Sequence, residues 1–154
     1  MVLTITIEGA SINDLDRLCR IERQCFKEEA FTNQQIAHLL TDYSTISLVA
    51  KANGEASGFI IGTIYFERNA AVGHILTIDV SPMHRRKGTG TKLLTEIEKI
   101  FKQKDVQTCS LEVRDDNYAA LSLYERLGYQ RIGKLRNYYG KADGIYLRKT
   151  LAQL

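Results

Sequence analysis

The stretch that decides the fold runs from Val72 to Lys104 and reads VGHILTIDVSPMHRRKGTGTKLLTEIEKIFKQK. Its first part, up to Val80, is rich in apolar and β-branched residues and predicts a strand that ends at Ser81-Pro82. From Gly88 onward apolar residues recur at helical spacing, which predicts a helix to about Lys104. A strand, a glycine-containing loop and a long helix are therefore expected to form the centre of a mixed sheet.

The loop inside this unit, Arg85-Arg86-Lys87-Gly88-Thr89-Gly90, has the features of a pyrophosphate cradle. Its two glycines let the backbone approach a ligand closely, and the free N–H groups of a helix start converge on one point. Three basic side chains add positive charge beside them. The loop matches neither of the two common nucleotide-binding glycine motifs. At this point a basic helix start that binds nothing remains an open alternative.

Outward from this centre, the remaining hydrophobic patterns alternate between strand and helix. Asn53-Gly54 is a strong hairpin turn signal, and Ser11 and Thr32 each begin a capping box before a helix. The pattern predicts an α/β (α+β) fold with a mixed sheet of about seven strands and helices on both faces, in a single domain over residues 1–154. Strands are expected at 4–8, 46–52, 56–67, 72–80, 108–114, 129–135 and 144–151, and helices after Ser11, after Thr32, at 88–104 and at 117–127.

Composition excludes several classes of protein. The chain is 44% apolar and 25% charged, which is typical of a globular protein. The longest nearly apolar run, Phe59–Phe66, is too short to span a bilayer, and no secretory signal precedes the first strand, so no membrane association is expected. A net charge of +3 is too small to argue for nucleic acid.

The sulfur and imidazole side chains argue for a reducing compartment and against a metal site. Three cysteines, Cys19, Cys25 and Cys109, have no C-x-x-C pairing and are expected as reduced thiols. Together with three histidines they lack the spacing of metal ligands, so no metal is expected. The predicted location is the cytoplasm.

A second group contains residue types that can carry out acid–base chemistry: Glu112, Asn117 and Tyr124. Glu112 lies between apolar neighbours on a strand and is a candidate base, while Tyr124 lies two helical turns after Asn117 and is a candidate acid. Taken singly, each has an ordinary alternative: a solvent-facing glutamate, a helix N-cap and a tyrosine at the edge of the core.

Together the two groups resemble the signatures of the GNAT acetyltransferase superfamily. Arg85–Gly90 matches Q/R-x-x-G-x-G/A, and NYAALSLYERLGY at Asn117–Tyr129 matches N-x-x-A-x-x-L-Y-x-x-x-G-[FY]. The resemblance covers nearly the whole chain and implies the GNAT fold and acetyl-CoA as cofactor, with coenzyme A as product. It implies that Tyr124 protonates the leaving thiolate. The cofactor would be bound by Ile78, Asp79 and Val80, by Arg85, Arg86, Lys87, Gly88, Thr89, Gly90 and Thr91, and by Asn117 and Tyr124.

A finer resemblance points to the N-terminal protein acetyltransferases of the archaeal type and to the bacterial enzymes that modify ribosomal proteins. Leu111-Glu112-Val113-Arg114 is similar to their fifth-strand motif, which implies Glu112 as general base. Gly73-His74-Ile75 resembles the fourth-strand start of the archaeal type, which implies a second catalytic side chain in His74. For His74 a structural histidine satisfied by a neighbour is an equal alternative. Arg136-Asn137-Tyr138-Tyr139 resembles the late hairpin, whose tyrosines, Tyr138 and Tyr139 here, bind the acceptor peptide.

The chain departs from this group between its first two helices, where a proline and a tryptophan are usual. Phe26-Lys27-Glu28-Glu29-Ala30-Phe31 contains neither, and Phe26 and Phe31 are expected to line the pocket for the first acceptor residue. Asp79 stands where a small residue is usual. The resemblance implies transfer of acetyl to a protein N-terminal α-amine. The alternatives are a GNAT enzyme acting on lysine or a small amine, and a non-catalytic acyl-CoA-binding module.

Overall fold

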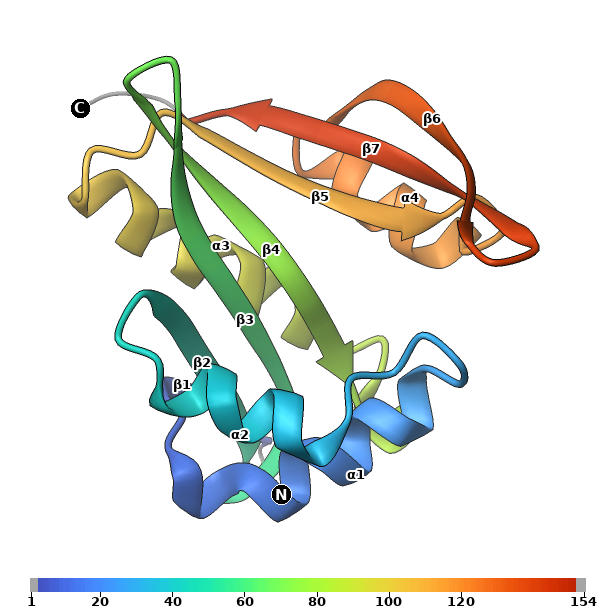
Figure 1. The fold of residues 1–154 in the computed structure, drawn as a ribbon. Coiled ribbons are helices and arrows are strands. Elements are labelled where there is room, and N and C mark those ends of the chain that lie inside the picture. The colour runs from blue at the N-terminus through green and yellow to red at the C-terminus, as the bar shows by residue number, and fades with distance from the viewer. Residues whose placement is uncertain (1–2, 152–154) are drawn as a thin grey trace. The chain divides into compact units, whose positions relative to one another are not determined.

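The computed structural model describes residues 3–151, which divide into two compact units (Figure 1). One unit contains the residues up to Thr63 together with Leu76–Lys99, and the other contains Ile64–Ile75 and the residues from Ile100 onward. In chain order the elements are β1 (Ile5–Gly9), η1 (Ile12–Asp14), α1 (Leu15–Cys25), α2 (Asn33–Thr41), β2 (Thr45–Ala52), β3 (Glu55–Glu67), β4 (Ala70–Val80), η2 (Pro82–His84), α3 (Thr89–Gln103), β5 (Thr108–Arg114), α4 (Tyr118–Arg126), β6 (Gln130–Tyr139) and β7 (Ala142–Thr150).

The strands form a mixed sheet of seven strands in the order β1-β2-β3-β4-β5-β7-β6. The pairs β1/β2, β2/β3, β5/β7 and β6/β7 are antiparallel, and β4 and β5 are parallel. The predicted α/β class and seven-stranded mixed sheet are confirmed. Whether residues 1–154 act as a single domain stays a prediction, and residues 1–2 and 152–154 lie outside the described residues.

Local signals in the first unit act as the sequence predicts. The Ser11 and Thr32 side chains both complete capping boxes, although the first opens a 3₁₀ turn before α1, which leaves Ile12 exposed. Asn53 and Gly54 both have positive φ, as the tight turn between β2 and β3 requires. The helices α1 and α2 pack on these strands through a core of Leu18, Cys19, Ile21, Ile36, Val49, Phe59 and Ile61.

Around the second unit β4, β6 and β7 differ from the predicted boundaries, since β4 begins at Ala70 and β7 begins at Ala142. The turn between β3 and β4 is formed by Arg68 and Asn69, both with positive φ. It contains no glycine that would have indicated a turn at this place. The strand β6 continues to Tyr139 rather than ending at Leu135, because register shifts at two places let it stay paired with β7. The residues Arg136–Tyr139 therefore belong to a strand and not only to a hairpin turn.

The parallel pair β4/β5 has a short register. Val72–His74 pair with Thr108–Ser110, although β4 continues to Val80 and β5 to Arg114. Main-chain groups in the last part of β4 therefore lie outside the β5 register. Among the described residues no helix is long and apolar enough to cross a membrane.

Candidate active site

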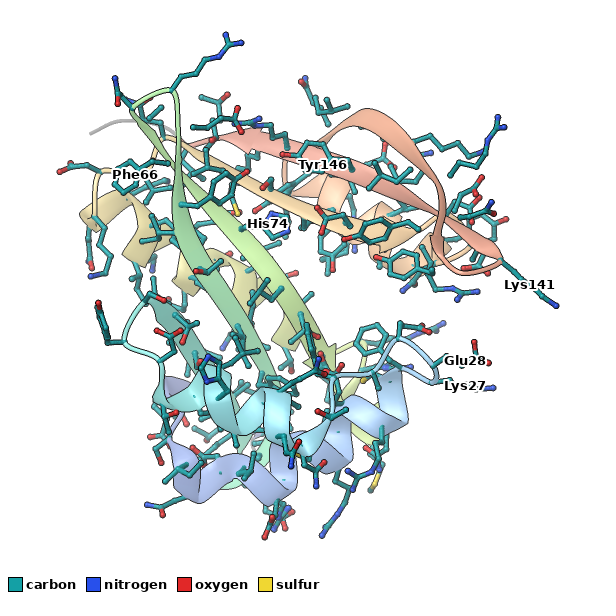
Figure 2. All side chains as sticks on the ribbon, viewed as in Figure 1. Lys27, Glu28, Phe66, His74, Lys141 and Tyr146 are labelled. Atoms are coloured by element: carbon teal, nitrogen blue, oxygen red, sulfur yellow. The ribbon has the colours of Figure 1, made fainter. Side chains whose placement is uncertain are left out.

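Sheet register in the second unit brings together polar side chains that are distant in sequence. Ser110 and Glu112 are two residues apart on β5 and so point to the same face of the sheet. His74 on β4 pairs with Ser110, and Tyr146 on β7 pairs with Glu112. Figure 2 shows the His74 and Tyr146 side chains on these two strands. The strands themselves thus assemble the predicted base and its neighbours.

His74 is held at both ring nitrogens. Its Nδ1 lies 2.7 Å from Ser110 Oγ, and its Nε2 lies 2.9 Å from Glu112 Oε1. The His74 and Glu112 side chains are 16% and 18% exposed, so both are shielded but still accessible from solvent. An imidazole fixed at both nitrogens has a defined orientation and tautomer. His74 is therefore satisfied by its neighbours and also contacts the candidate base.

The strand β6 places Tyr138 on the same carboxylate. Burial, and then the charge and hydrogen bonding of Glu112, raise the pKa of Tyr138. The ring lies against the backbone of Gly144, where an added Cβ would be 3.1 Å from Tyr138 Cβ. Tyr139 contacts Tyr138 edge-on, with ring centroids 4.9 Å apart. Tyr138 is still half exposed, and its role toward an acceptor peptide stays a prediction.

Tyr124 and Asn117 lie on α4 and serve its structure. The Asn117 side-chain oxygen accepts a hydrogen bond from the Ala120 N–H at 3.2 Å and caps the helix. Tyr124 is buried and packs edge-on against Tyr129, with ring centroids 6.0 Å apart. The ordinary structural roles of these two residues are thus present. Their roles toward acetyl-CoA stay predictions.

The cluster also contains residues that the sequence analysis missed. Ser110 is fully buried, and the hydroxyl of Tyr65 on β3 is hydrogen-bonded to Ser110 and to Tyr146. Burial raises the pKa of Tyr65, and its ring stands edge-on to His74 with centroids 6.3 Å apart. Alternation along β5 puts Ser110 on the face of Glu112, so the sequence contained a signal for Ser110. It contained no signal for the two tyrosines, because their positions depend on which strands pair.

The predicted phosphate loop lies in the first unit and leads into α3. Arg86 and Gly88 both have positive φ, and Arg86, Lys87 and Gly88 are exposed. The first backbone bond of the helix runs from the Lys92 N–H to the Gly88 carbonyl at 3.0 Å. The N–H groups of residues 89–91 therefore precede the helical ladder and point out of its end. This local geometry, with its positive charge, fits a pyrophosphate.

Arg85 is engaged within the protein. Its Nε donates to the Val80 carbonyl at 3.0 Å, and its Nη2 lies 3.4 Å from Cys25 Sγ. The guanidinium thus ties the loop to the ends of β4 and α1. All three basic residues of the loop, Arg85, Arg86 and Lys87, are exposed, while Thr89 is buried.

The end of β4 alternates between its two faces. Thr77 and Asp79 are buried, whereas Ile78 and Val80 are half-buried on the opposite side. Asp79 therefore offers a cofactor only its main chain, since its side chain turns to α1. The close approach of Gly58, whose added Cβ would lie 2.6 Å from the Asp79 carbonyl oxygen, fixes this strand against β3.

Asp79 joins Glu22 in a buried pair of carboxyl groups. The Thr77 hydroxyl lies 2.6 Å from Asp79 Oδ1 and 3.1 Å from Glu22 Oε1. Burial, and then the charge and hydrogen bonding of Glu22, raise the pKa of Asp79 well above its usual range. The protonated form of Asp79 is therefore favoured beside Glu22, and its Oδ2 has no hydrogen-bond partner in the part of the chain that the structure describes.

The segment between α1 and α2 is hydrogen-bonded to Glu22 of the same pair. Glu22 Oε2 accepts a hydrogen bond from the Phe31 N–H at 3.0 Å, directly before the Thr32 cap of α2. Phe31 also packs against the core of this unit, whereas Phe26 ends α1 in an extended conformation. Lys27 and Glu28 between them point into solvent (Figure 2). The role of both phenylalanines in an acceptor pocket stays a prediction.

The cysteines and the possible metal ligands of the described residues also bear on the class of protein. Cys19, Cys25 and Cys109 are free thiols. Within residues 3–151 no group of three or more His, Cys, Asp or Glu side chains is arranged to hold a metal ion. One loop fits a pyrophosphate, and one carboxylate contacts an imidazole. Both features are typical of an enzyme that transfers a group from a nucleotide-bearing donor.

Known proteins agree with this class. The model of the acetyltransferase (GNAT) family matches residues 13–129. An N-alpha-acetyltransferase of Sulfurisphaera tokodaii is 31% identical over 150 residues, covering 92% of this chain and 89% of that protein. The ribosomal protein bS18 alanine N-acetyltransferase of Escherichia coli K12 is 30% identical, covering 90% of each chain. The crystal structure of Ard1 from Thermoplasma volcanium superposes with a TM-score of 0.87 at 26% identity, covering 97% of this chain and 99% of that one.

The chain therefore belongs to the GNAT acetyltransferase family. It is an N-acetyltransferase, and its cofactor is acetyl-CoA. The resemblance stated from the sequence motifs is confirmed.

Proposed function

We propose that this chain transfers acetyl from acetyl-CoA to the free α-amine of protein N-termini, with ribosomal proteins among the acceptors. The observation that carries the proposal is the contact of Glu112 with both His74 and Tyr138. A candidate base and a side chain expected to bind the acceptor peptide thus share one carboxylate. The names of the relatives from Sulfurisphaera tokodaii and Escherichia coli support the same acceptor class.

Removal of a proton from the acceptor is the step assigned to Glu112. An α-amine has a pKa of about 8, against about 10.4 for lysine, so it needs less help to become a nucleophile at neutral pH. The Glu112 carboxylate takes that proton, and His74 orients the carboxylate from its Nε2. Direct attack on the acetyl group in a ternary complex follows, with no covalent enzyme intermediate.

The remaining residues bind and stabilise. Bound acetyl-CoA supplies the acetyl group as an activated thioester. The exposed loop Arg86–Gly88 and the N–H groups at the start of α3 would hold the pyrophosphate, and main-chain groups of Ile78–Val80 would hold the arm and stabilise negative charge on an acyl oxygen. Asn117 supports the arm with its amide. The Tyr124 hydroxyl holds the proton that the leaving group requires.

We place the reaction in the cytoplasm. The free state of Cys19, Cys25 and Cys109 supports a reducing compartment, where nascent protein N-termini are also available.

The test is a mass-spectrometric acetylation assay with acetyl-CoA. The panel contains short peptides that differ in their first residues, the same peptides with blocked N-termini and an internal lysine, and spermidine. Acetylation of the free α-amine alone is the expected result, and the ranking of peptides gives the acceptor preference. Acetylation of the blocked peptides or of spermidine would replace the proposal by lysine or small-amine acetylation. Binding of acetyl-CoA without any transfer would favour a non-catalytic module.

A further inference from the structure

The segment between α1 and α2, residues 26–31, begins at a helix end that is fixed to the last residue of β4. The Cys25 thiol donates to the Val80 carbonyl at 3.4 Å, and the same carbonyl accepts from Arg85 Nε at 3.0 Å. Burial, and then the charge of Asp79, raise the pKa of Cys25, so the thiol keeps the proton that it donates. The start of the segment is therefore anchored to β4 within the first unit.

The end of the segment is anchored to the same part of β4 by a second route. The Phe31 N–H donates to Glu22 Oε2 at 3.0 Å. The other oxygen of this carboxyl group, Oε1, lies 3.1 Å from the Thr77 hydroxyl, which also lies 2.6 Å from Asp79 Oδ1. Glu22 thus uses one oxygen for the segment and the other for the strand.

The second anchor is closed to solvent. Glu22, Thr77 and Asp79 are 1%, 6% and 2% exposed, so water has little access to replace their hydrogen bonds. A hydroxyl has one proton to donate, so the two contacts of Thr77 are strongest when one carboxyl group is protonated, the form that the raised pKa of Asp79 favours. The three side chains therefore act as one connected unit.

Both anchors lead to residues whose main chain has a place in the proposed reaction. The main chain of Ile78–Val80 is expected to hold the arm of acetyl-CoA, and Phe26 and Phe31 are expected to line the pocket for the first acceptor residue. A segment anchored at both ends has a fixed position relative to the end of β4. The anchors thus set the distance between that pocket and the acetyl group.

We propose that Glu22, Thr77 and Asp79 are positioning residues that hold the α1–α2 segment against the end of β4 and thereby restrict the first residue of the acceptor. This inference rests on the proposed function, since it concerns the acceptor of the same reaction. The three side chains act through the segment and do not touch the acceptor themselves. Loosening them widens the range of first residues that the enzyme accepts.

The matched variants are Thr77→Val, which removes the bridging hydroxyl but keeps the branched shape, and Thr77→Ser, which keeps the hydroxyl. With peptides that differ in their first residue, we expect Thr77→Val to shrink the kcat/KM ratio between the most and least preferred peptides about fivefold. The KM for acetyl-CoA should stay unchanged, and Thr77→Ser should retain the wild-type ranking. A merely structural role would lower kcat/KM for all peptides equally and leave the ratio constant.

Two further variants complete the set. Asp79→Ala removes one acid of the pair and should shrink the same ratio, which keeps the proposal testable if Thr77→Val folds poorly. Ser57→Ala is the control and should leave the ratio unchanged. Ser57 is also buried in the first unit, but its hydroxyl donates to the Ala50 carbonyl, outside the connected unit of Glu22, Thr77 and Asp79.

A second readout needs no acceptor. Deuterium exchange of the Phe31 amide, followed by NMR, should be about tenfold faster in Thr77→Val than in the wild type or in Ser57→Ala. Unchanged exchange, or an unchanged ratio in both Thr77→Val and Asp79→Ala, would overturn the positioning role. A wild type that acetylates no free α-amine would instead refute the proposed function, and the exchange rates would still decide whether Thr77 anchors the segment.

Discussion

The two units of the molecule each contain a paired glutamate, and the two pairs are opposite in character. Glu112 is partly exposed, faces an imidazole and accepts hydrogen bonds from more than one side. Glu22 is fully buried and faces a second acid, Asp79, whose pKa is raised by burial and by the charge of Glu22. The partner and the burial, not the residue type, therefore decide the role. In the proposed reaction the first pair accepts a proton during turnover, whereas the second connects α1, β4 and the α1–α2 segment through hydrogen bonds of Thr77 and Phe31.

The largest difference is expected from the same amide substitution in the two pairs. Glu112→Gln should lower kcat about 10²-fold or more at neutral pH and leave acetyl-CoA affinity unchanged, because only the base is lost. Glu22→Gln should retain most of kcat, since the amide can still accept from Phe31 and donate to Asp79. Steady-state kinetics with peptide and calorimetry with acetyl-CoA measure both. An unchanged rate for Glu112→Gln would move the base role to another group.

The second prediction concerns stability. Glu22→Ala leaves the Phe31 N–H and the Asp79 carboxyl without their partner in a buried site, so unfolding should become easier by about 2–3 kcal/mol. Urea denaturation measures this change. Glu28→Ala, at an exposed position in the α1–α2 segment, is the control and should change stability by less than about 0.5 kcal/mol. Equal losses in the two variants would show that the pair does not anchor the segment.

These two pairs also show how far the sequence could predict the molecule. Capping boxes at Ser11 and Thr32 and the Asn53-Gly54 turn act over a few residues, so the elements they bound were predictable. Glu112 and His74 were singled out by motif, and the structure brings them into contact, while their catalytic roles stay predictions. Glu22 was not found, because its partner is 57 positions away and only the folded sheet brings the two acids together.

The third prediction tests Tyr138 as an acceptor-binding residue of the Glu112 cluster. Tyr138→Phe removes a hydroxyl that contacts the carboxylate and should lower kcat/KM for peptide about fivefold, the range of one hydrogen bond. Tyr43→Phe, on a fully exposed side chain, is the control. A variant that keeps full kcat/KM would mean that Tyr138 only packs on Gly144, which would favour the lysine or small-amine alternative.

The smallest effect should be a change in the pH dependence of stability. Asp79 has a raised pKa in the folded state, so the native protein binds a proton that the unfolded chain loses above about pH 3.9. Wild-type stability should therefore fall as the pH rises from about 4 toward the folded pKa of Asp79. Asp79→Asn does not titrate and should lack this slope, so its stability should rise relative to that of the wild type between pH 4 and neutral pH. Parallel stability curves from pH 4 to 8 would refute the raised pKa of Asp79.

The contact between Tyr138 and Gly144 can help to predict which acceptors related chains prefer. With no side chain at Gly144, the tyrosine ring packs against the strand beside it, where an added Cβ would lie 3.2 Å from Tyr138 Cδ2. Part of its rotational entropy is then lost when the protein folds and not when a peptide arrives, which favours recognition by a small surface. A glycine six positions after the tyrosine is thus part of the same recognition element. Relatives that keep the tyrosine but carry a larger residue there should display the ring in a different pose and prefer different acceptors.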